Sequence, residues 1–216
     1  MKQSLRRLTA AHPHLWYQLY WVVYLVWFFT LDNVIKSGTL IHCALDDRIP
    51  FCEWFVVFYC SWFALLVFVT LKLWLNDTAA YDRLCLMMFS GMTFCLIVYM
   101  IWPSALNLRP DPAALGRANP ALWLLQLLWR ADAAVNVCPS IHCQSTGCMA
   151  LAFSCSAVAR GKPRLQLLAW VWAALICLST VFTKQHSVID VALGLALVLP
   201  WYLALYCRRR DKARPA

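Results

Sequence analysis

Long runs of apolar residues, separated by short polar segments, dominate the pattern of this chain. The four clearest runs span residues 15–35, 51–75, 84–102 and 165–183. Each is close to the roughly 20 residues that a helix needs to cross the hydrocarbon core of a membrane. Two further runs, residues 137–159 and 187–207, reach that length once their polar residues are placed at a helix end. The pattern therefore predicts an all-α membrane protein, with six transmembrane helices in one bundle and a single domain over residues 1–216.

The composition agrees with this pattern, because 62% of the residues are apolar and only 13% are charged. Residues 103–136 form the only long loop, and it contains the apolar stretch PALWLLQLLWRAD, which is too short to span. We expect this stretch to be an interfacial helix with Trp123 and Trp129 at headgroup depth. Such a helix either roofs a cleft through which lipid reaches the bundle or simply packs against the bundle.

Basic residues are distributed unevenly between the two sides of the predicted bundle. With the N-terminus in the cytoplasm, 13 of the 19 basic residues lie on the inside. The outside residues are Lys36, Arg48, Arg109, Arg117, Arg130 and Lys184. The positive-inside rule therefore favours cytoplasmic N- and C-termini. Anionic lipid headgroups are sufficient partners for the net charge of +9, so no nucleic acid is implied.

The 11 cysteines are scattered, and most lie inside the predicted spans, where a thiol behaves as a small apolar side chain. They do not suggest a disulfide scaffold. Cys43 and Cys52 share the first outside loop and could pair if that side is oxidising. The first apolar run ends without a small-residue cleavage site, so we expect a retained signal anchor.

Polar residues gather at the outer ends of several predicted spans. The candidates are Arg109 in the long loop, Ser140 and His142 at the start of the fourth span, and Lys184, His186 and Asp190 at the start of the sixth. His186 and Asp190 are four residues apart and share one helix face, so the carboxylate could orient the imidazole as a nucleophile or base. An aspartate favoured by the helix dipole beside an ordinary interfacial histidine explains this pair equally well.

The segment VCPSIHC suggests an anion site at the start of a helix. Proline suits a first helical turn, and the free backbone N–H groups there bind phosphate. His142 would stand one turn away, placed to give a proton to a leaving oxygen. Arg109 and Lys184 add positive charge; each alone would be an ordinary headgroup contact, but with two histidines they describe a phosphoryl-transfer site.

These residues resemble two signature motifs of the type 2 phosphatidic acid phosphatase superfamily, a group of six-span membrane phosphatases and phosphotransferases. The matching positions are Pro139, Ser140 and His142 in the first of these motifs, and Ser179, His186 and Asp190 in the second. Within the superfamily, the chain is most similar to the branch that contains inositol phosphorylceramide synthases. The resemblance covers most of the chain in span count and motif order.

The resemblance implies a role for each matching residue. His186 would attack phosphorus and carry a phosphohistidine, Asp190 would orient it, and His142 would protonate the leaving group. Ser140, Ser179 and Arg109 would hold the phosphoryl oxygens, and neither a metal ion nor another cofactor is needed. The implied enzyme is an integral membrane lipid phosphatase or lipid phosphotransferase acting on phosphate esters of lipids at the outer leaflet.

The chain departs from the family pattern at two basic positions. A lysine expected seven residues before Arg109 is Trp102, and an arginine expected directly after Ser179 is Thr180. Lys184 would replace one of these cations if it reaches the same phosphate oxygens. The short loops favour a bacterial inner membrane with the active site on the periplasmic face; the lipid, the acceptor and the oligomeric state are left open.

Some of the same residues would also suit two other classes of protein. A metal-dependent membrane hydrolase would use Cys138, His142, Cys143, His186 and Asp190 as ligands. The two neighbouring basic side chains would, however, repel a divalent cation. A transporter would line its path with ionisable residues, but the charged groups here gather at one interface rather than at mid-depth.

Overall fold

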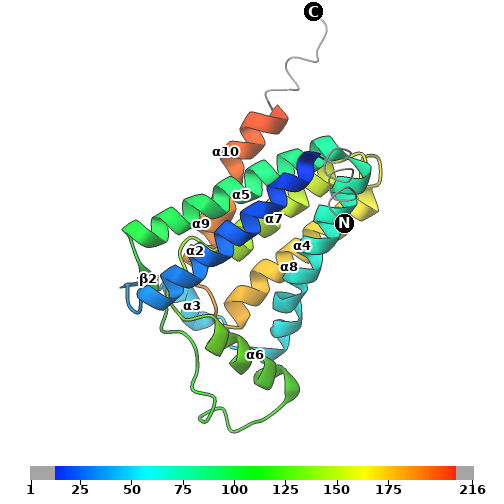
Figure 1. Cartoon of the computed structure of the whole chain (residues 1–216). Helices are drawn as coiled ribbons and strands as arrows, with labels where there is room; N and C mark the ends of the chain where they lie inside the picture. The colour runs from blue at the N-terminus through cyan, green and yellow to red at the C-terminus, as the bar shows by residue number, and fades with distance from the viewer. Residues whose placement is uncertain (1–12, 208–216) are drawn as a thin grey trace, which may run out of the picture.

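A computed structural model describes residues 13–207, which are mostly helical (Figure 1). The basic residues predicted for the cytoplasmic side before residue 13 and after residue 207 lie outside this range. The longer helices are α2 (Tyr20–Val34), α4 (Val56–Asn76), α5 (Thr78–Ile101), α6 (Pro120–Ala131), α7 (Ile141–Cys155), α8 (Pro163–Phe182) and α9 (Val188–Ala196). The shorter elements are η1 (Pro13–Leu19), α3 (Ala44–Arg48), η2 (Glu53–Phe55), α10 (Val198–Tyr202) and η3 (Leu203–Cys207).

Four helical segments are long and apolar enough to cross a membrane, which indicates a membrane protein. They are Glu53–Asn76, Thr78–Ile101, Pro163–Phe182 and Val188–Cys207. The other two predicted spans correspond to α2 and α7, which have 15 α-helical residues each. Helix length alone therefore supports four of the six expected spans, since roughly 20 residues are needed.

The short helix α7 lies at the centre of the bundle. It packs against α4, α5, α8 and α9, and all but two of its residues are buried. A helix enclosed by protein can carry polar side chains that find partners there: Gln144 Nε2 donates to the carbonyl of Met87 on α5 at 3.1 Å. Gly91 of α5 permits this approach, because a Cβ atom at that position would clash with the Gln144 side chain. Burial by its neighbours thus explains why the fourth predicted span is less apolar than the others.

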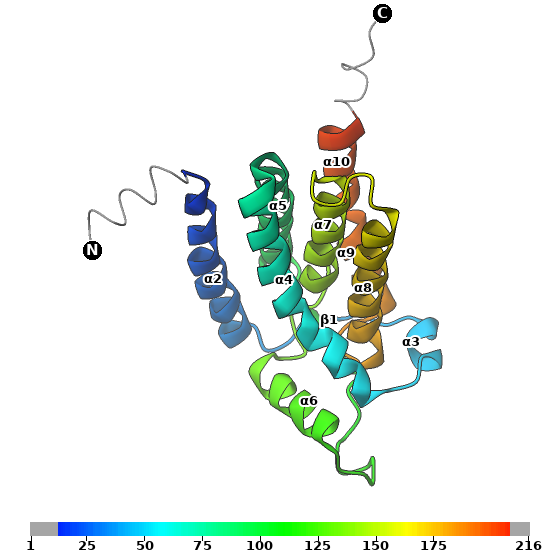
Figure 2. The same ribbon diagram turned by 90° about the vertical axis from the view of Figure 1, so that its right-hand side faces the viewer.

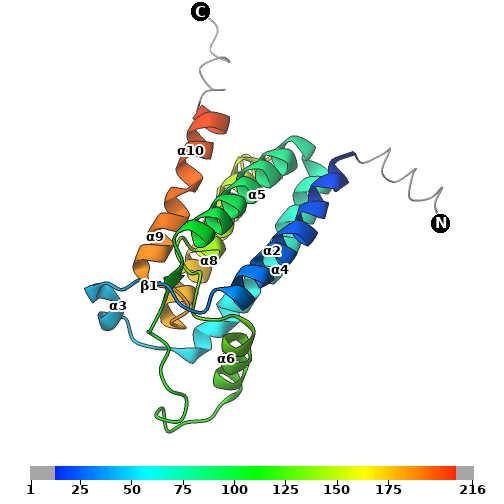
Figure 3. The same ribbon diagram turned by 60° about the vertical axis from the view of Figure 1, so that its left-hand side comes forward.

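The last candidate span is not one regular helix. It consists of α9, α10 and the π-helical turn η3, which follow one another along one flank of the bundle (Figure 3). Pro200 lies within α10 and has no N–H group to donate to a preceding carbonyl. Pro200 therefore interrupts the backbone hydrogen bonds of this segment.

The outer loops are joined by a feature that the all-α prediction did not include. Strand β1 (Thr39–Leu40) pairs in parallel with strand β2 (Ser104–Ala105), which links the first outer loop to the long one. The Ser104 hydroxyl accepts hydrogen bonds from the backbone N–H groups of Val137 and Cys138, at 3.1 and 3.0 Å. These contacts fix the chain just before α7.

Helix α6 is the short apolar helix expected in the long loop. Asn119 caps it by accepting a hydrogen bond from Leu122 N at 2.9 Å, and Pro120 occupies its first position. Leu125 is buried against the bundle, whereas Trp123 is 64% exposed. Figure 2 shows α6 across the end of the bundle at which α4 begins, while η1 and α10 lie at the opposite end.

Candidate active site

The loop between α8 and α9 positions His186 and its carboxylate partner. Ser187 caps α9, and its backbone N–H donates to Asp190 Oδ2 at 2.8 Å, so the start of α9 is a capping box. The same Oδ2 atom lies 3.4 Å from Nδ1 of His186. This geometry turns Nδ1 toward the carboxylate, so Nε2 is the candidate nucleophilic nitrogen.

The protein environment changes the basicity of His186. Its Nδ1 atom is buried, and its separation from Asp190 is longer than the roughly 2.7–2.9 Å of a short charge-assisted hydrogen bond. Burial acts to lower the pKa of His186, but the adjacent carboxylate of Asp190 outweighs it, with smaller contributions from Cys143 and Asp132. The pKa of His186 is therefore raised above its ordinary value.

His142 occupies the first turn of α7 and faces His186. Its ring lies between Tyr59 and Trp62 of α4, with centroid distances of 4.7 and 4.9 Å. Trp62 is itself fixed by a hydrogen bond from its Nε1 to the Ser145 hydroxyl at 3.0 Å. The centroids of the His142 and His186 rings are 5.8 Å apart, which is close enough for one phosphoryl group to contact both.

Both histidines line a cavity of about 420 Å³. Its walls are mainly aromatic and aliphatic side chains from α2 and α4, joined by Leu128 and Ala131 of α6. The other polar residues that line it are Asp132, Asn136 and Gln185. The sequence analysis did not select these three, although Gln185 adjoins His186 and the other two interrupt an apolar stretch.

Arg109 lies behind Gln185 and is not among the residues that line the cavity. One of its terminal nitrogens donates to Gln185 Oε1 at 2.6 Å, and the other donates to the carbonyl of Asp132 at 3.0 Å. Burial lowers the pKa of Arg109, opposed by the charge of Asp132. An arginine starts from so high a pKa that its guanidinium stays charged. Arg109 therefore places a positive charge behind Gln185.

The remaining predicted phosphate ligands are engaged elsewhere in this structure. The Ser140 hydroxyl accepts from Cys143 N at 3.3 Å as the cap of α7, and the Ser179 hydroxyl donates to the carbonyl of Ile176 at 2.6 Å. The ammonium of Lys184 donates to the carbonyls of Asp46 and Ile49, at 2.7 and 2.6 Å. The expectation that Lys184 points to the phosphate is therefore corrected: its side chain tethers the first outer loop.

Neither departure from the family motif places a cation at the cavity. Trp102 ends α5 and is partly exposed. Thr180 is fully buried, and its hydroxyl donates to the carbonyl of Cys177 at 2.7 Å. No lysine or arginine side chain is among the described residues that line the cavity.

Asp46 of α3 is a structural carboxylate that the sequence analysis missed. It is fully buried and accepts hydrogen bonds from the Ser187 hydroxyl at 2.7 Å, from Val188 N at 2.8 Å and from Cys43 N at 2.8 Å. Burial acts to raise the pKa of Asp46, but these hydrogen bonds outweigh it and hold the pKa below its ordinary value. Asp46 thus clamps the loop that carries His186.

The cysteines and possible metal ligands were also located. All 11 cysteines lie within the described residues and are free thiols, Cys43 and Cys52 included. Among residues 13–207, no three His, Cys, Asp or Glu side chains are grouped so as to hold a metal ion.

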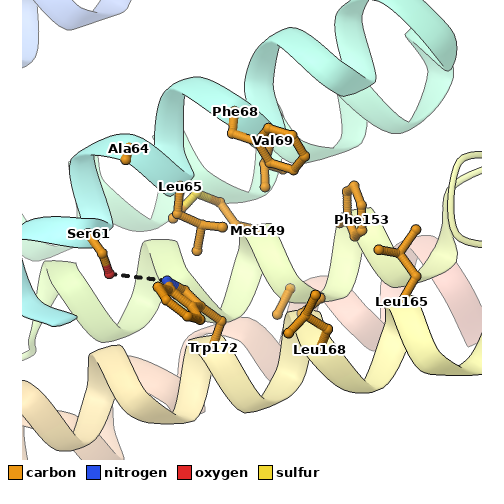
Figure 4. Close-up of a pocket in the computed structure, with 12 residues that line it drawn as sticks. Ser61, Ala64, Leu65, Phe68, Val69, Met149, Phe153, Leu165, Leu168 and Trp172 are labelled. Atoms are coloured by element: carbon orange, nitrogen blue, oxygen red, sulfur yellow. Dashed lines mark hydrogen bonds between the residues drawn. The ribbon is translucent and has the colours of Figure 1, made fainter.

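A second cavity of about 360 Å³ lies between α4, α7 and α8 (Figure 4). Its lining is apolar except for Ser61, whose hydroxyl accepts a hydrogen bond from Trp172 Nε1 at 3.1 Å. It contains neither a titratable nor a nucleophilic pair, so it lacks the chemistry of the histidine-lined cavity.

Comparison with known proteins adds no relative: no protein-family model matches the chain, and no curated protein or solved structure gives a significant match.

Proposed function

We propose that the chain is an integral membrane enzyme that cleaves or transfers phosphate esters of lipids through a phosphohistidine intermediate. The observation that carries the proposal is the pair of facing imidazoles in one cavity, with ring centroids 5.8 Å apart and a carboxylate behind one of them. The starts of α7 and α9 are in contact, because Ser140 N donates to the carbonyl of Asp190 at 3.0 Å.

The chemistry assigned to the site has two half-reactions. In the first, Nε2 of His186 attacks phosphorus, the bond from phosphorus to the leaving oxygen breaks, and His142 gives that oxygen a proton. In the second, an acceptor oxygen attacks phosphorus, its proton passes to His142, and the phosphorus–nitrogen bond breaks. Asp190 keeps His186 oriented in both steps.

The cavity also suits the apolar part of a lipid. Its aromatic wall includes Tyr24 and Phe28 of α2, while Phe29 and Phe63 lie partly exposed on the outer faces of α2 and α4. A hydrocarbon tail can therefore leave the site sideways into the bilayer. We propose that α2 and α7 complete a bundle of six spans in a bacterial inner membrane, with both termini in the cytoplasm and the site on the periplasmic side.

The proposal is tested with purified protein in lipid nanodiscs and a panel of lipid phosphates, by measuring released phosphate and exchanged headgroups. His186→Ala should abolish turnover. The matched control is His42→Ala, because His42 also pairs with a carboxylate, with Nε2 2.9 Å from Asp47 Oδ1, but is exposed in an outer loop. Equal turnover by wild type and His186→Ala would end the proposal.

A second measurement addresses the intermediate and the metal-dependent alternative. Labelled phosphate should remain on the wild-type chain after rapid quenching in base, where phosphohistidine survives, and should be absent from His186→Ala. Turnover should persist in the presence of a strong chelator. Loss of turnover on chelation, restored by a divalent cation, would favour the metal-dependent class instead.

A further inference from the structure

Two amide side chains that line the histidine-lined cavity have polar atoms without a hydrogen-bond partner. Asn136 is only 6% exposed, and neither its Oδ1 nor its Nδ2 atom has a partner in the structure. Gln185 is 2% exposed, and its Nε2 atom is also unpaired. Because a buried polar group without a partner costs free energy comparable to a lost hydrogen bond, such groups in a cavity point to a ligand.

The backbone fixes the position of Asn136. Its φ angle is 56°, in the left-handed region that asparagine adopts more readily than most residues. Its N–H group donates to the carbonyl of Ser104 at 2.6 Å. The amide is therefore held at the cavity wall by the same contacts that fix the start of α7.

Asp132 also lines this cavity. Its backbone carbonyl is bound by Arg109, but among the described residues no hydrogen bond or ion pair within 4.0 Å engages its side chain. Burial raises the pKa of Asp132, opposed by the charges of Arg109 and His186. A carboxylate with a raised pKa suits a group that accepts a proton or a hydrogen bond.

Hydrogen-bonding chemistry divides this wall into two parts. A phosphate has only acceptor oxygens when ionised, so it pairs with Gln185 Nε2, which Arg109 supports from behind. The carboxylate of Asp132 would instead repel phosphate oxygens, and the amide of Asn136 beside it offers both an acceptor and a donor. They match a hydroxyl group, which donates one hydrogen bond and can accept another from Asn136 Nδ2.

We propose that Asp132 and Asn136 form the subsite for the hydroxyl of an acceptor alcohol, so that this chain transfers its phosphoryl group to an alcohol in preference to water. This assignment rests on the proposed function and specifies its second half-reaction. Asp132 accepts a hydrogen bond from the hydroxyl and aims the oxygen at phosphorus, while the proton passes to His142 as the new bond forms. The apolar part of an alcohol would also cover the apolar side chains that line the cavity. Water, with about 30 Å³ per molecule, would leave that surface uncovered.

The test measures how the phosphoenzyme divides between two acceptors. Protein in nanodiscs receives a lipid phosphate that wild type turns over, together with 1-octanol or diacylglycerol, and the ratio of transfer product to free phosphate is determined. Wild type should favour the transfer product. Asp132→Asn and Asn136→Leu should each lower the ratio by about tenfold or more, the loss expected for one hydrogen bond to a charged or buried partner. Phosphoenzyme formation should change by much less.

Matched controls lie in the same loop. Asp111→Asn and Asn107→Leu alter exposed residues of the same types and should leave the ratio unchanged. Asp132→Glu should give a higher ratio of transfer product to free phosphate than Asp132→Asn. This partial rescue is not expected if Asp132 has only a structural role.

The outcomes separate this assignment from the proposed function. If no variant changes the ratio, or wild type releases only free phosphate with every alcohol, the acceptor subsite is refuted while the phosphohistidine chemistry stands. If His186→Ala still forms the phosphoenzyme, the proposed function itself fails.

Discussion

Replacing Asp46 with asparagine should destabilise the protein and disturb the site, although Asp46 does not line the cavity. Its Oδ2 atom accepts from Ser187 Oγ and Cys43 N, and its Oδ1 atom accepts from Val188 N. An asparagine amide has one acceptor oxygen, so its NH₂ group must face at least one of these donors. Whichever way the amide turns, one or two hydrogen bonds are lost.

The size of the effect follows from burial and charge. A hydrogen bond to a charged group contributes roughly 1.5–3 kcal/mol, so one or two losses should cost about 1.5–6 kcal/mol. For a chain of this length each kcal/mol lowers the melting temperature by roughly 2–4 °C. We therefore expect Asp46→Asn to melt at least about 3 °C lower in detergent, with reduced turnover because the loop that carries His186 is released.

The neighbouring residue provides the control. Asp47 has the same charge, but its side chain is 64% exposed and pairs only with the exposed His42 in the outer loop. Asp47→Asn should therefore melt like wild type. Equal melting temperatures for Asp46→Asn and Asp47→Asn would refute the assignment of Asp46 as the clamp.

The pH dependence of stability gives a second readout for the same residue. The folded-state pKa of Asp46 is lower than its unfolded value. The contribution of Asp46 to the free energy of unfolding is therefore fully present above about pH 4. It is lost as the pH falls through the lower, folded-state pKa. Melting measured from pH 7 down to pH 2 should show a smaller acid-induced loss for Asp46→Asn than for wild type.

Two further predictions concern the reactive histidine and the apolar cavity. Because the pKa of His186 is raised and the nucleophile must be neutral, kcat/KM should rise with pH through a value above about 6.5. Asp190→Asn should move this acidic limb to lower pH; an unchanged limb would show that another group controls it. In the second cavity, Trp172→Phe removes the hydrogen bond to Ser61 and should cost about 1 kcal/mol, measured by unfolding in detergent. Ser61→Ala should cost a similar amount with no further loss in the double variant, whereas additive losses would mean that the two side chains do not interact.

The sequence predicts the histidine pair because local spacing determines most of what is needed. His186 lies just before the Ser187 cap of α9, and Asp190 lies in the first turn of that helix. The contact between them is therefore local, although His186 is outside the helix on which the four-residue spacing would place it. His142 follows Ser140, which begins α7 as the cap of that helix. The long apolar runs likewise predict the helices, except where burial by protein rather than lipid allows α7 to be short and partly polar.

The residues that the sequence could not place are those whose partners lie far along the chain. Lys184 is close to His186 in sequence, but its backbone has a φ angle of 56°, which turns the side chain away from the following helix and toward the first outer loop. Asp46 is 141 residues from Ser187, and no local pattern pairs them. Asn136 is separated from Gln185 by the whole of α7 and α8, so its unpaired amide becomes visible only when the cavity is formed. Local residue spacing thus predicts where the two histidines lie, whereas the polar groups around them depend on tertiary contacts between outer loops.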